Sequence, residues 1–362
     1  MALREKRLNM VILLRLLQWT EKGKLTKKKL NLLQKKDKGN IMNKRFLSIL
    51  SFLAIFLFAN LSQALASQDK LRDDIRIYSM KNSDGKITAK TIEKAFKDSG
   101  FEIIGNNNMN VAFEKRFGGG KDFKIYRLMF VHNKKYGAKL LKDFPEFGLL
   151  APLSTSVYSK DGKTINISSL SLTGMSRISG VPKTNKDLIA LHDQMTKALK
   201  KALPKGEFIK LSYKKIRPDG ELVTRFAFNL KVEDGDDIQD AKDSYQETME
   251  GEIESLGFIV AGFYPVIDDL SENDVDDYEF YDTYSICKLE VIYPVHKKHP
   301  EVGAFAPCTM YMYKKKDENF TRMGYPSVYN WIMSTNIYDD ESLTPLIDAQ
   351  DQLESAIDST IE

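Results

Sequence analysis

Apolar residues recur along this chain with two spacings, which predict helices and strands in alternation. Leu188, Leu191, Met195 and Leu199 share one helical stripe and predict a helix over 185–203. Comparable spacing predicts helices over 88–99, 134–144, 237–256 and 339–361, with a helical turn over 111–116. Alternating or short apolar runs predict strands over 75–80, 101–104, 123–132, 154–159, 163–169, 207–215, 221–232, 258–261, 284–293, 309–314 and 321–324.

Turn residues between several of these runs predict hairpins. Asp161-Gly162 separates the strands 154–159 and 163–169, and Arg217-Pro218-Asp219-Gly220 separates 207–215 from 221–232. Because hairpins dominate, we expect an α+β fold with antiparallel sheets and not a doubly wound fold.

One motif, P-E-x-G-x-x-A-P, occurs twice with an offset of 155 residues and indicates an internal duplication. Its five fixed positions are Pro145, Glu146, Gly148, Ala151 and Pro152 in the first copy and Pro300, Glu301, Gly303, Ala306 and Pro307 in the second. Each copy precedes a strand-like run, so the motif is typical of a rigid helix-to-strand corner. A ligand-binding corner is the alternative, and the sequence leaves both interpretations open.

The duplication predicts a first repeat over 67–204 and a second over 205–362. The linker Pro204-Lys205-Gly206 is too short to hold two domains apart, so we expect one pseudo-twofold unit. The two closing helices would either pack on each other or each on its own sheet.

The segment Phe96 to Gly105 and the two proline corners carry a resemblance to a known family. The chain resembles a tandem copy of the bacterial domain-of-unknown-function family 302, over 74–203 and, more divergently, 207–361. The resemblance implies a TATA-binding-protein-like fold, with a long helix packed across each curved antiparallel sheet, and it implies no activity. Relatives often carry Cys after the corner proline, whereas here only the second repeat has it, as Pro307-Cys308 beside Pro152-Leu153.

The N-terminal region predicts export to the periplasm. Residues 42–66 combine a basic start, an apolar run and the small residues Ala64 and Ala66, which is typical of a signal peptide cleaved after Ala66. Residues 1–41 are interpreted as a mis-annotated upstream leader, and a basic binding arm is the alternative. A retained membrane anchor is the alternative to cleavage, but the apolar run is short for a membrane span.

Removal of the leader reverses the net charge. Residues 1–66 hold 14 of the 54 Lys and Arg and 3 of the 50 Asp and Glu, which leaves 40 basic and 47 acidic residues, a net charge of about −7. An acidic protein is a poor nucleic-acid binder, so we expect no nucleic-acid partner and no stable membrane insertion after cleavage.

Few residues suggest chemistry. Cys308 with His299 could form a thiol nucleophile and base, and His296 with His299 has the spacing of a weak metal pair. Acidic stretches at 234–243 and 268–282 could bind calcium, although neither matches an EF-hand loop. Whether Cys287 and Cys308 form a disulfide stays open. The glycines at 118–120 precede a strand, which argues against a phosphate loop, and no cofactor is expected.

The sequence therefore predicts an exported protein without catalysis, which binds a small molecule or a periplasmic protein. A groove between the repeats, or between a helix and a sheet, could hold an apolar ligand. The alternative is a thiol-dependent enzyme or metal-binding protein that uses Cys308 and His299. An oligomer is compatible with either function.

Overall fold

Two antiparallel sheets of matching topology form the folded part of the chain. The computed structural model describes residues 73–120, 122–216, 220–235 and 237–361, which all belong to one compact unit. The predicted leader, signal peptide and cleavage after Ala66 lie outside the described residues.

Each repeat contributes its own series of elements. The first comprises β1 (Ile75–Lys81), α4 (Ala89–Lys97), β2 (Glu102–Asn108), α5 (Met109–Phe117), β3 (Ile125–His132), α6 (Lys134–Asp143), the 3₁₀ turn η1 (Pro145–Leu150), β4 (Leu153–Ser159), β5 (Thr164–Leu170), α7 (Leu172–Ser179) and α8 (Lys186–Ala202). After the short β6 (Glu207–Phe208), the second comprises β7 (Val223–Phe228), α9 (Ile238–Ser255), β8 (Phe258–Pro265), α10 (Ile267–Glu272), β9 (Tyr278–Lys288), α11 (Leu289–Lys298), the 3₁₀ turn η2 (Pro300–Ala304), β10 (Cys308–Lys315), β11 (Thr321–Pro326), α12 (Tyr329–Thr335) and α13 (Asp340–Ile361).

The strand orders show that the repeats are equivalent. The first sheet has the order β2-β3-β4-β5-β1-β6, and the second, read from its β8 edge, has the order β8-β9-β10-β11-β7. Each strand of the second sheet thus takes the position of its counterpart in the first, with β6 as an addition. The predicted α+β class with two antiparallel repeats is confirmed, while the specific likeness to TATA-binding protein stays a prediction.

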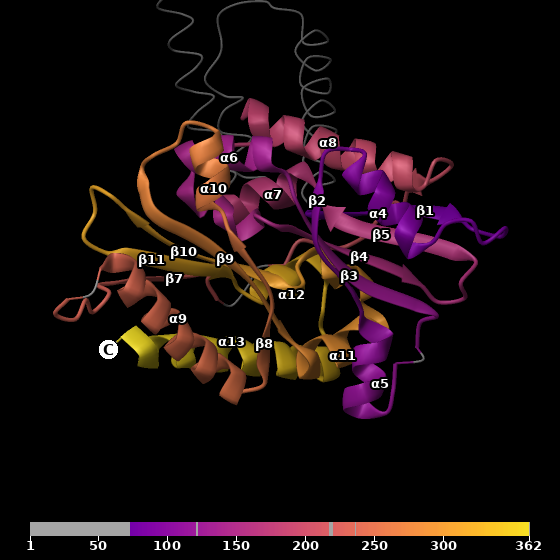
Figure 1. The fold of residues 1–362 in the computed structure, drawn as a ribbon. Coiled ribbons are helices and arrows are strands. Elements are labelled where there is room, and N and C mark those ends of the chain that lie inside the picture. The colour runs from indigo at the N-terminus through magenta and orange to yellow at the C-terminus, as the bar shows by residue number, and fades with distance from the viewer. Residues whose placement is uncertain (1–72, 121, 217–219, 236, 362) are drawn as a thin grey trace, which may run out of the picture. The chain divides into compact units, whose positions relative to one another are not determined.

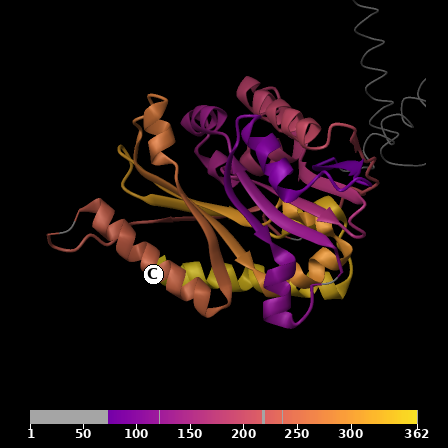
Figure 2. The same ribbon diagram turned by 45° about the vertical axis from the view of Figure 1, so that its right-hand side comes forward.

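A pair of helices covers the outer face of each sheet (Figures 1 and 2). Helices α4 and α8 pack together over the first sheet, and α9 and α13 pack together over the second. The closing helices α8 and α13 therefore lie on opposite sides of the unit, each on its own sheet.

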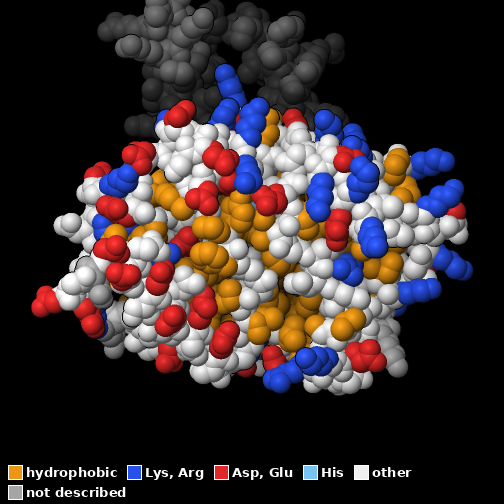
Figure 3. Space-filling model, viewed as in Figure 1, with side chains coloured by type: hydrophobic (Ala, Val, Ile, Leu, Met, Phe, Trp, Pro, Cys, Tyr) orange, Lys and Arg blue, Asp and Glu red, His pale blue; other side chains and the backbone are white. Residues whose placement is uncertain are grey.

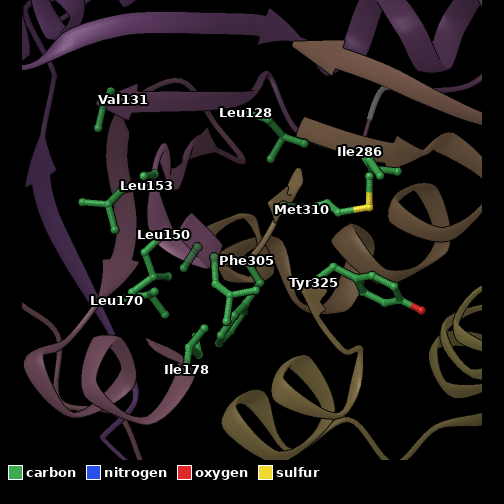
Figure 4. Packing of buried hydrophobic residues seen from close by; sticks show 14 of the residues in the cluster. Leu128, Val131, Leu150, Leu153, Leu170, Ile178, Ile286, Phe305, Met310 and Tyr325 are labelled. Carbon is green, nitrogen blue, oxygen red and sulfur yellow. The ribbon is translucent and has the colours of Figure 1, made fainter. Parts of the chain in front are cut away.

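One cluster of buried apolar side chains continues through both repeats (Figure 4). Leu128 and Leu153 of the first sheet belong to the same cluster as Ile286, Met310 and Tyr325 of the second. Strand β4 is buried at all 7 of its positions, so both of its faces are covered. Since helices cover only one face, the other repeat supplies the second cover, and the expected shared unit is confirmed.

The predicted hairpin between 207–215 and 221–232 is wrong. Strand β6 pairs with β1 of the first sheet, and β7 pairs with β11 of the second. Residues 217–219 of the predicted turn lie outside the described residues. A turn-like sequence does not choose the partner strand, which non-local pairing within the sheets decides. Residues 207–208 consequently belong to the first sheet, although the predicted boundary assigns them to the second repeat.

The predicted strand over 284–293 is also wrong in its second half. Strand β9 ends at Lys288, and Leu289–Lys298 forms helix α11, which buries Val291, Ile292 and Val295. The β-branched residues favour a strand locally, but packing of this face against the core outweighs that preference. The short helices α7, α10 and α12 were not predicted.

Candidate functional site

The two proline corners are exchanged between the repeats. Turn η1 of the first repeat lies on β10 and β11 of the second sheet, and η2 of the second repeat lies on β4 and β5 of the first. The corners therefore occupy the junction of the two repeats, and both of their Ala–Pro peptide bonds are cis.

Matching hydrogen bonds fix the first proline of each corner. The Tyr281 hydroxyl donates to the carbonyl oxygen of Pro145 at 2.5 Å, and the Ser156 hydroxyl donates to that of Pro300 at 2.8 Å. Each donor belongs to the opposite repeat. Because buried backbone carbonyls need a partner, neither corner is satisfied by its own repeat alone.

The last proline of each corner is held in the same reciprocal way. Ser154 donates to the carbonyl oxygen of Pro307 at 2.8 Å, and Thr309 donates to that of Pro152 at 3.0 Å. These two donors lie at equivalent positions, each near the start of the strand that follows its own corner.

The corner glycines allow the close approach of the repeats. A Cβ atom on Gly148 would lie 2.1 Å from the Tyr281 hydroxyl, and one on Gly303 would lie 2.4 Å from Cβ of Ser156. Neither glycine has a positive φ, so the requirement is space and not backbone conformation.

The corner glutamates also have side-chain partners, Glu146 across the junction and Glu301 within its own repeat. Glu146 accepts two hydrogen bonds from the Arg225 guanidinium, at 2.6 and 2.8 Å. Glu301 is only 5% exposed, accepts from the Tyr213 hydroxyl at 2.6 Å and lies 3.4 Å from Nδ1 of His299. These contacts are typical of a structural corner, since they use the polar groups that a ligand would need.

A buried ionic cluster, absent from our sequence predictions, joins the repeats at another point. His132 Nε2 and the Tyr264 hydroxyl each lie 2.8 Å from Asp269 Oδ2, and Lys134 Nζ lies 3.3 Å from Oδ1. Burial alone would raise the pKa of Asp269, but the hydrogen bonds from His132 and Tyr264 hold it below its ordinary value. Asp269 belongs to one of the acidic stretches considered for calcium, but its carboxylate oxygens contact His132, Tyr264 and Lys134 of the same chain.

The other candidate metal and thiol residues do not converge. His296 is buried, its ring packs against Phe113 and Tyr126, and burial lowers its pKa. His299 lies instead beside Glu301, and within the described ranges no group of three or more His, Cys, Asp or Glu side chains could hold a metal ion.

Both cysteines are free, and their thiols are in apolar surroundings. Burial raises the pKa of Cys308 to about 12 and that of Cys287 to about 12. A thiol nucleophile needs a lowered pKa, so these surroundings weigh against thiol-dependent catalysis.

A groove opens where the edge strands of the two sheets approach each other. Strands β2 and β8 are in contact, and the Phe130 ring lies against Gly105 of β2 and Gly262 of β8. Beside this point lies a hollow of about 360 Å³. Its apolar lining comes from Met109, Val111 and Leu128 of the first repeat and from Ile259, Ala261 and Leu289 of the second.

The groove is largely apolar and open to solvent. Val111 is 60% exposed and Ile259 is 43% exposed. Figure 3 shows an apolar patch in the middle of this face, over β8 and toward α5. Pro307 of the second corner also lines the groove, which is therefore continuous with the junction. The sequence predicted such a groove only in general terms, because its walls lie about 150 residues apart along the chain.

Comparison with known proteins identifies the repeats but no activity. The family model described as "Domain of unknown function DUF302" matches residues 78–202 and again 238–360. A solved structure, "Crystal structure of uncharacterized conserved protein DUF302 from Bacillus stearothermophilus", is similar at 16% identity with a TM-score of 0.30, and the match covers 39% of this chain and 97% of that one. No curated protein matches the chain.

The junction predicts that methyl groups at the corner glycines destabilise the fold. We expect Gly148→Ala and Gly303→Ala each to lower the free energy of unfolding by about 1–3 kcal/mol, because the neighbouring repeat must move. Gly251→Ala is the control, since Gly251 lies on the exposed side of α9 with no atom within 4 Å of the new methyl, and it should stabilise by up to about 1 kcal/mol. Denaturant unfolding measures all three, and corner variants as stable as the parent protein would contradict the exchange.

The buried thiols are expected to lose their protons only at high pH. Between the ordinary thiol pKa of about 8.5 and about 12, the folded protein keeps protons that the unfolded chain releases, so stability should fall as pH rises through this window. We expect iodoacetamide to modify the native protein slowly until the pH approaches 12, and the unfolded protein readily near pH 9. Rapid modification of Cys308 near pH 7 that depends on His299 would instead favour the thiol enzyme.

Proposed function

The chain belongs to the family of the domain of unknown function DUF302, and from that premise we propose that it is an exported protein that binds a small, largely apolar ligand without catalysis. The ligand occupies the groove between β2, α5 and β8. Its binding site thus belongs to the pair of repeats and to neither repeat alone.

The groove is the observation that supports this proposal. A volume of about 360 Å³ lies within the range of about 300–1,000 Å³ that is typical of small-molecule sites. Apolar side chains from two repeats line it, with amide groups of 106–108 at one side. Exposed apolar surface of this kind on a folded protein commonly marks a binding site.

The absence of catalysis is supported by the state of the candidate nucleophile. Cys308 has a raised pKa, and the ring nitrogens of His299 lie 3.4 Å from Glu301 and 3.9 Å from Asp339. A protein-interaction role at the same groove, or assembly of several copies, is the second form of this proposal. An extended apolar segment of a periplasmic partner would then take the place of the small ligand.

Export rests on the sequence of residues 42–66, which is typical of a signal peptide. Within the described part of the chain, none of the helices has the length and apolar character needed to cross a membrane. The proposed location is the periplasm.

Export predicts a defined N-terminus. We expect the protein from a periplasmic fraction to begin at Ser67, because cleavage follows Ala66. Ile55→Arg should leave the uncleaved precursor in the cytoplasm, because the added charge interrupts the apolar run of the signal peptide. N-terminal sequencing of both fractions measures this, and a periplasmic protein that still begins at Met1 or Met42 would refute the assignment.

If an apolar ligand binds in the groove, a charged side chain placed in the groove should weaken its binding. We expect the fluorescent apolar probe 1-anilinonaphthalene-8-sulfonate to bind the folded protein, and Val111→Asp to weaken it about tenfold by removing roughly 1.5 kcal/mol of apolar contact. Val232→Asp is the matched control, because Val232 is 50% exposed but does not line the groove. Equal binding to both variants would place the probe elsewhere and contradict the proposal.

A further inference from the structure

The second sheet has an edge strand that lacks the neighbour its counterpart has. Strand β7 is the last strand of this sheet, whereas its counterpart β1 in the first sheet is covered by β6. Within the described part of the chain, no strand takes the corresponding place beside β7. Because a strand edge presents unpaired N–H and C=O groups, it is a template for a further strand.

The register of the two sheets identifies equivalent residues on the two edges. It can be followed strand by strand from the fourth residues of β4 and β10. Arg225 is then the counterpart of Ile77, and Phe226 is the counterpart of Tyr78. The paired residues that connect them are Ser156 with Ser168 in the first sheet and Tyr311 with Gly324 in the second.

Strand β6 shows how an extended segment binds to this edge in the first repeat. The Ile209 N–H donates a hydrogen bond to the carbonyl oxygen of Ile77 at 2.9 Å. Phe208 lies opposite Tyr78 in antiparallel register, and the centroids of their rings are 4.8 Å apart. The second repeat keeps an aromatic residue, Phe226, at the position of Tyr78.

The backbone of β7 is free to bind in the same way. The Thr224 carbonyl oxygen points toward β11, because it would lie 2.9 Å from a Cβ atom on Gly324. Alternation along the strand therefore directs the N–H and C=O groups of Arg225 and Ala227 to the open edge. Both residues are exposed, and within the described ranges none of these backbone groups has a hydrogen-bond partner.

An acidic hollow lies beside this edge, between β7 and helix α13. It measures about 450 Å³ and is lined by the carboxylates of Glu221, Asp351 and Glu354, none of which forms an ion pair with another described residue. Arg225 is the one cation among its described lining residues, and Glu146 already binds it. The hollow therefore favours a basic group on whatever binds here.

We propose that the β7 edge binds an extended segment of a partner protein as an additional antiparallel strand. The segment has an aromatic residue opposite Phe226 and a basic residue two positions later. In the register of β6, that basic residue lies opposite Thr224, which lines the hollow together with Asp351 and Glu354. Main-chain hydrogen bonds supply the affinity, and the carboxylates supply the selectivity. This surface shares no lining residue with the groove between β2, α5 and β8.

A peptide copied from β6 is the probe for this edge. A fluorescein-labelled peptide with the sequence of residues 205–212, Lys-Gly-Glu-Phe-Ile-Lys-Leu-Ser, has the aromatic residue and the lysine at the required spacing. We expect it to bind the full chain, and fluorescence anisotropy measures its affinity. N-methylation of its isoleucine removes the N–H that would donate to Arg225, so the affinity should fall about tenfold.

Two variants of one edge residue test the backbone of β7. Ala227→Pro removes the outward N–H and should weaken the peptide about tenfold, and an edge strand tolerates proline at such a position. Ala227→Ser is the control, because it keeps the N–H and should bind the peptide like the parent protein. Circular dichroism checks that both variants are folded.

A charge variant tests the hollow. Asp351→Asn combined with Glu354→Gln should weaken the peptide about fivefold at low salt, and should not weaken a peptide in which glutamate replaces the second lysine. Asp348→Asn is the control, because Asp348 is exposed on the same helix α13 and does not line the hollow.

The outcomes separate this edge from other surfaces. Equal binding of the peptide to the parent protein and to Ala227→Pro, or equal binding of the N-methylated and unmodified peptides, would overturn the inference. Binding that falls instead with Val111→Asp belongs to the groove and also overturns it. If the peptides do not bind but Ala227→Pro converts a dimer to a monomer in sedimentation, a second copy of this chain occupies the edge and the partner segment is refuted. The fluorescent probe tests the groove independently of all these results.

Discussion

Each repeat has one layer of helices, but its sheet is buried on both faces, and the need for a second covering layer determines the rest of the structure. Strand β4 is buried at every position, and in β10 the adjacent residues Met310, Tyr311 and Met312 are all buried. Successive side chains point to opposite faces, so both faces of each central strand must be covered. The exchanged corners provide the second cover, and the carbonyl oxygens of Pro145 and Pro300 accept hydrogen bonds from side chains of the opposite sheet. Neither repeat could cover both faces of its sheet and satisfy its corner without the other.

The same packing leaves the groove open. The edge strands β2 and β8 approach at Gly105 and Gly262, where the Phe130 ring lies between them. Strand register makes Phe130 equivalent to Ser285, because each lies opposite the edge-strand glycine of its own repeat. Phe130 is large and Ser285 is small, so the Phe130 ring alone occupies the space between the two edge-strand glycines. Beyond it the two edges are not paired with each other, and their apolar side chains form the walls of the hollow.

Local signals predicted most of the elements, whereas partners far apart in sequence were not predictable. The duplicated corner motif predicted two repeats, and the helical stripe over 185–203 predicted α8. The Asp161-Gly162 signal predicted the hairpin between β4 and β5, where Asp161 accepts hydrogen bonds from the backbone N–H groups of Lys163 and Thr164. The pairing of β6 with β1 depends on the three-dimensional arrangement of the sheets, which a turn sequence does not specify. The same holds for the contact between His132 and Asp269, which lie 137 positions apart in the sequence. Two repeats could be recognised from sequence, but the groove could not be located, since it exists only where two distant edges meet.

Because the two repeats belong to one chain, equivalent positions at the junction can carry different side chains. The hydrogen bonds to the corner carbonyls occur on both sides, but the charged residues differ. In a homodimer, each contact across the twofold axis would occur twice. Here the corner hydrogen bonds do occur twice with like partners, whereas the ion pairs across the junction are one-sided. In both Lys134–Asp269 and Arg116–Glu290 the basic member belongs to the first repeat and the acidic member to the second. Lys115 likewise lies on α5, and the counterpart helix α10 carries Asp268 and Asp269 in its first turn. A single chain can therefore keep the contacts that hold two sheets together while equivalent helices on the two sides of the junction diverge in charge.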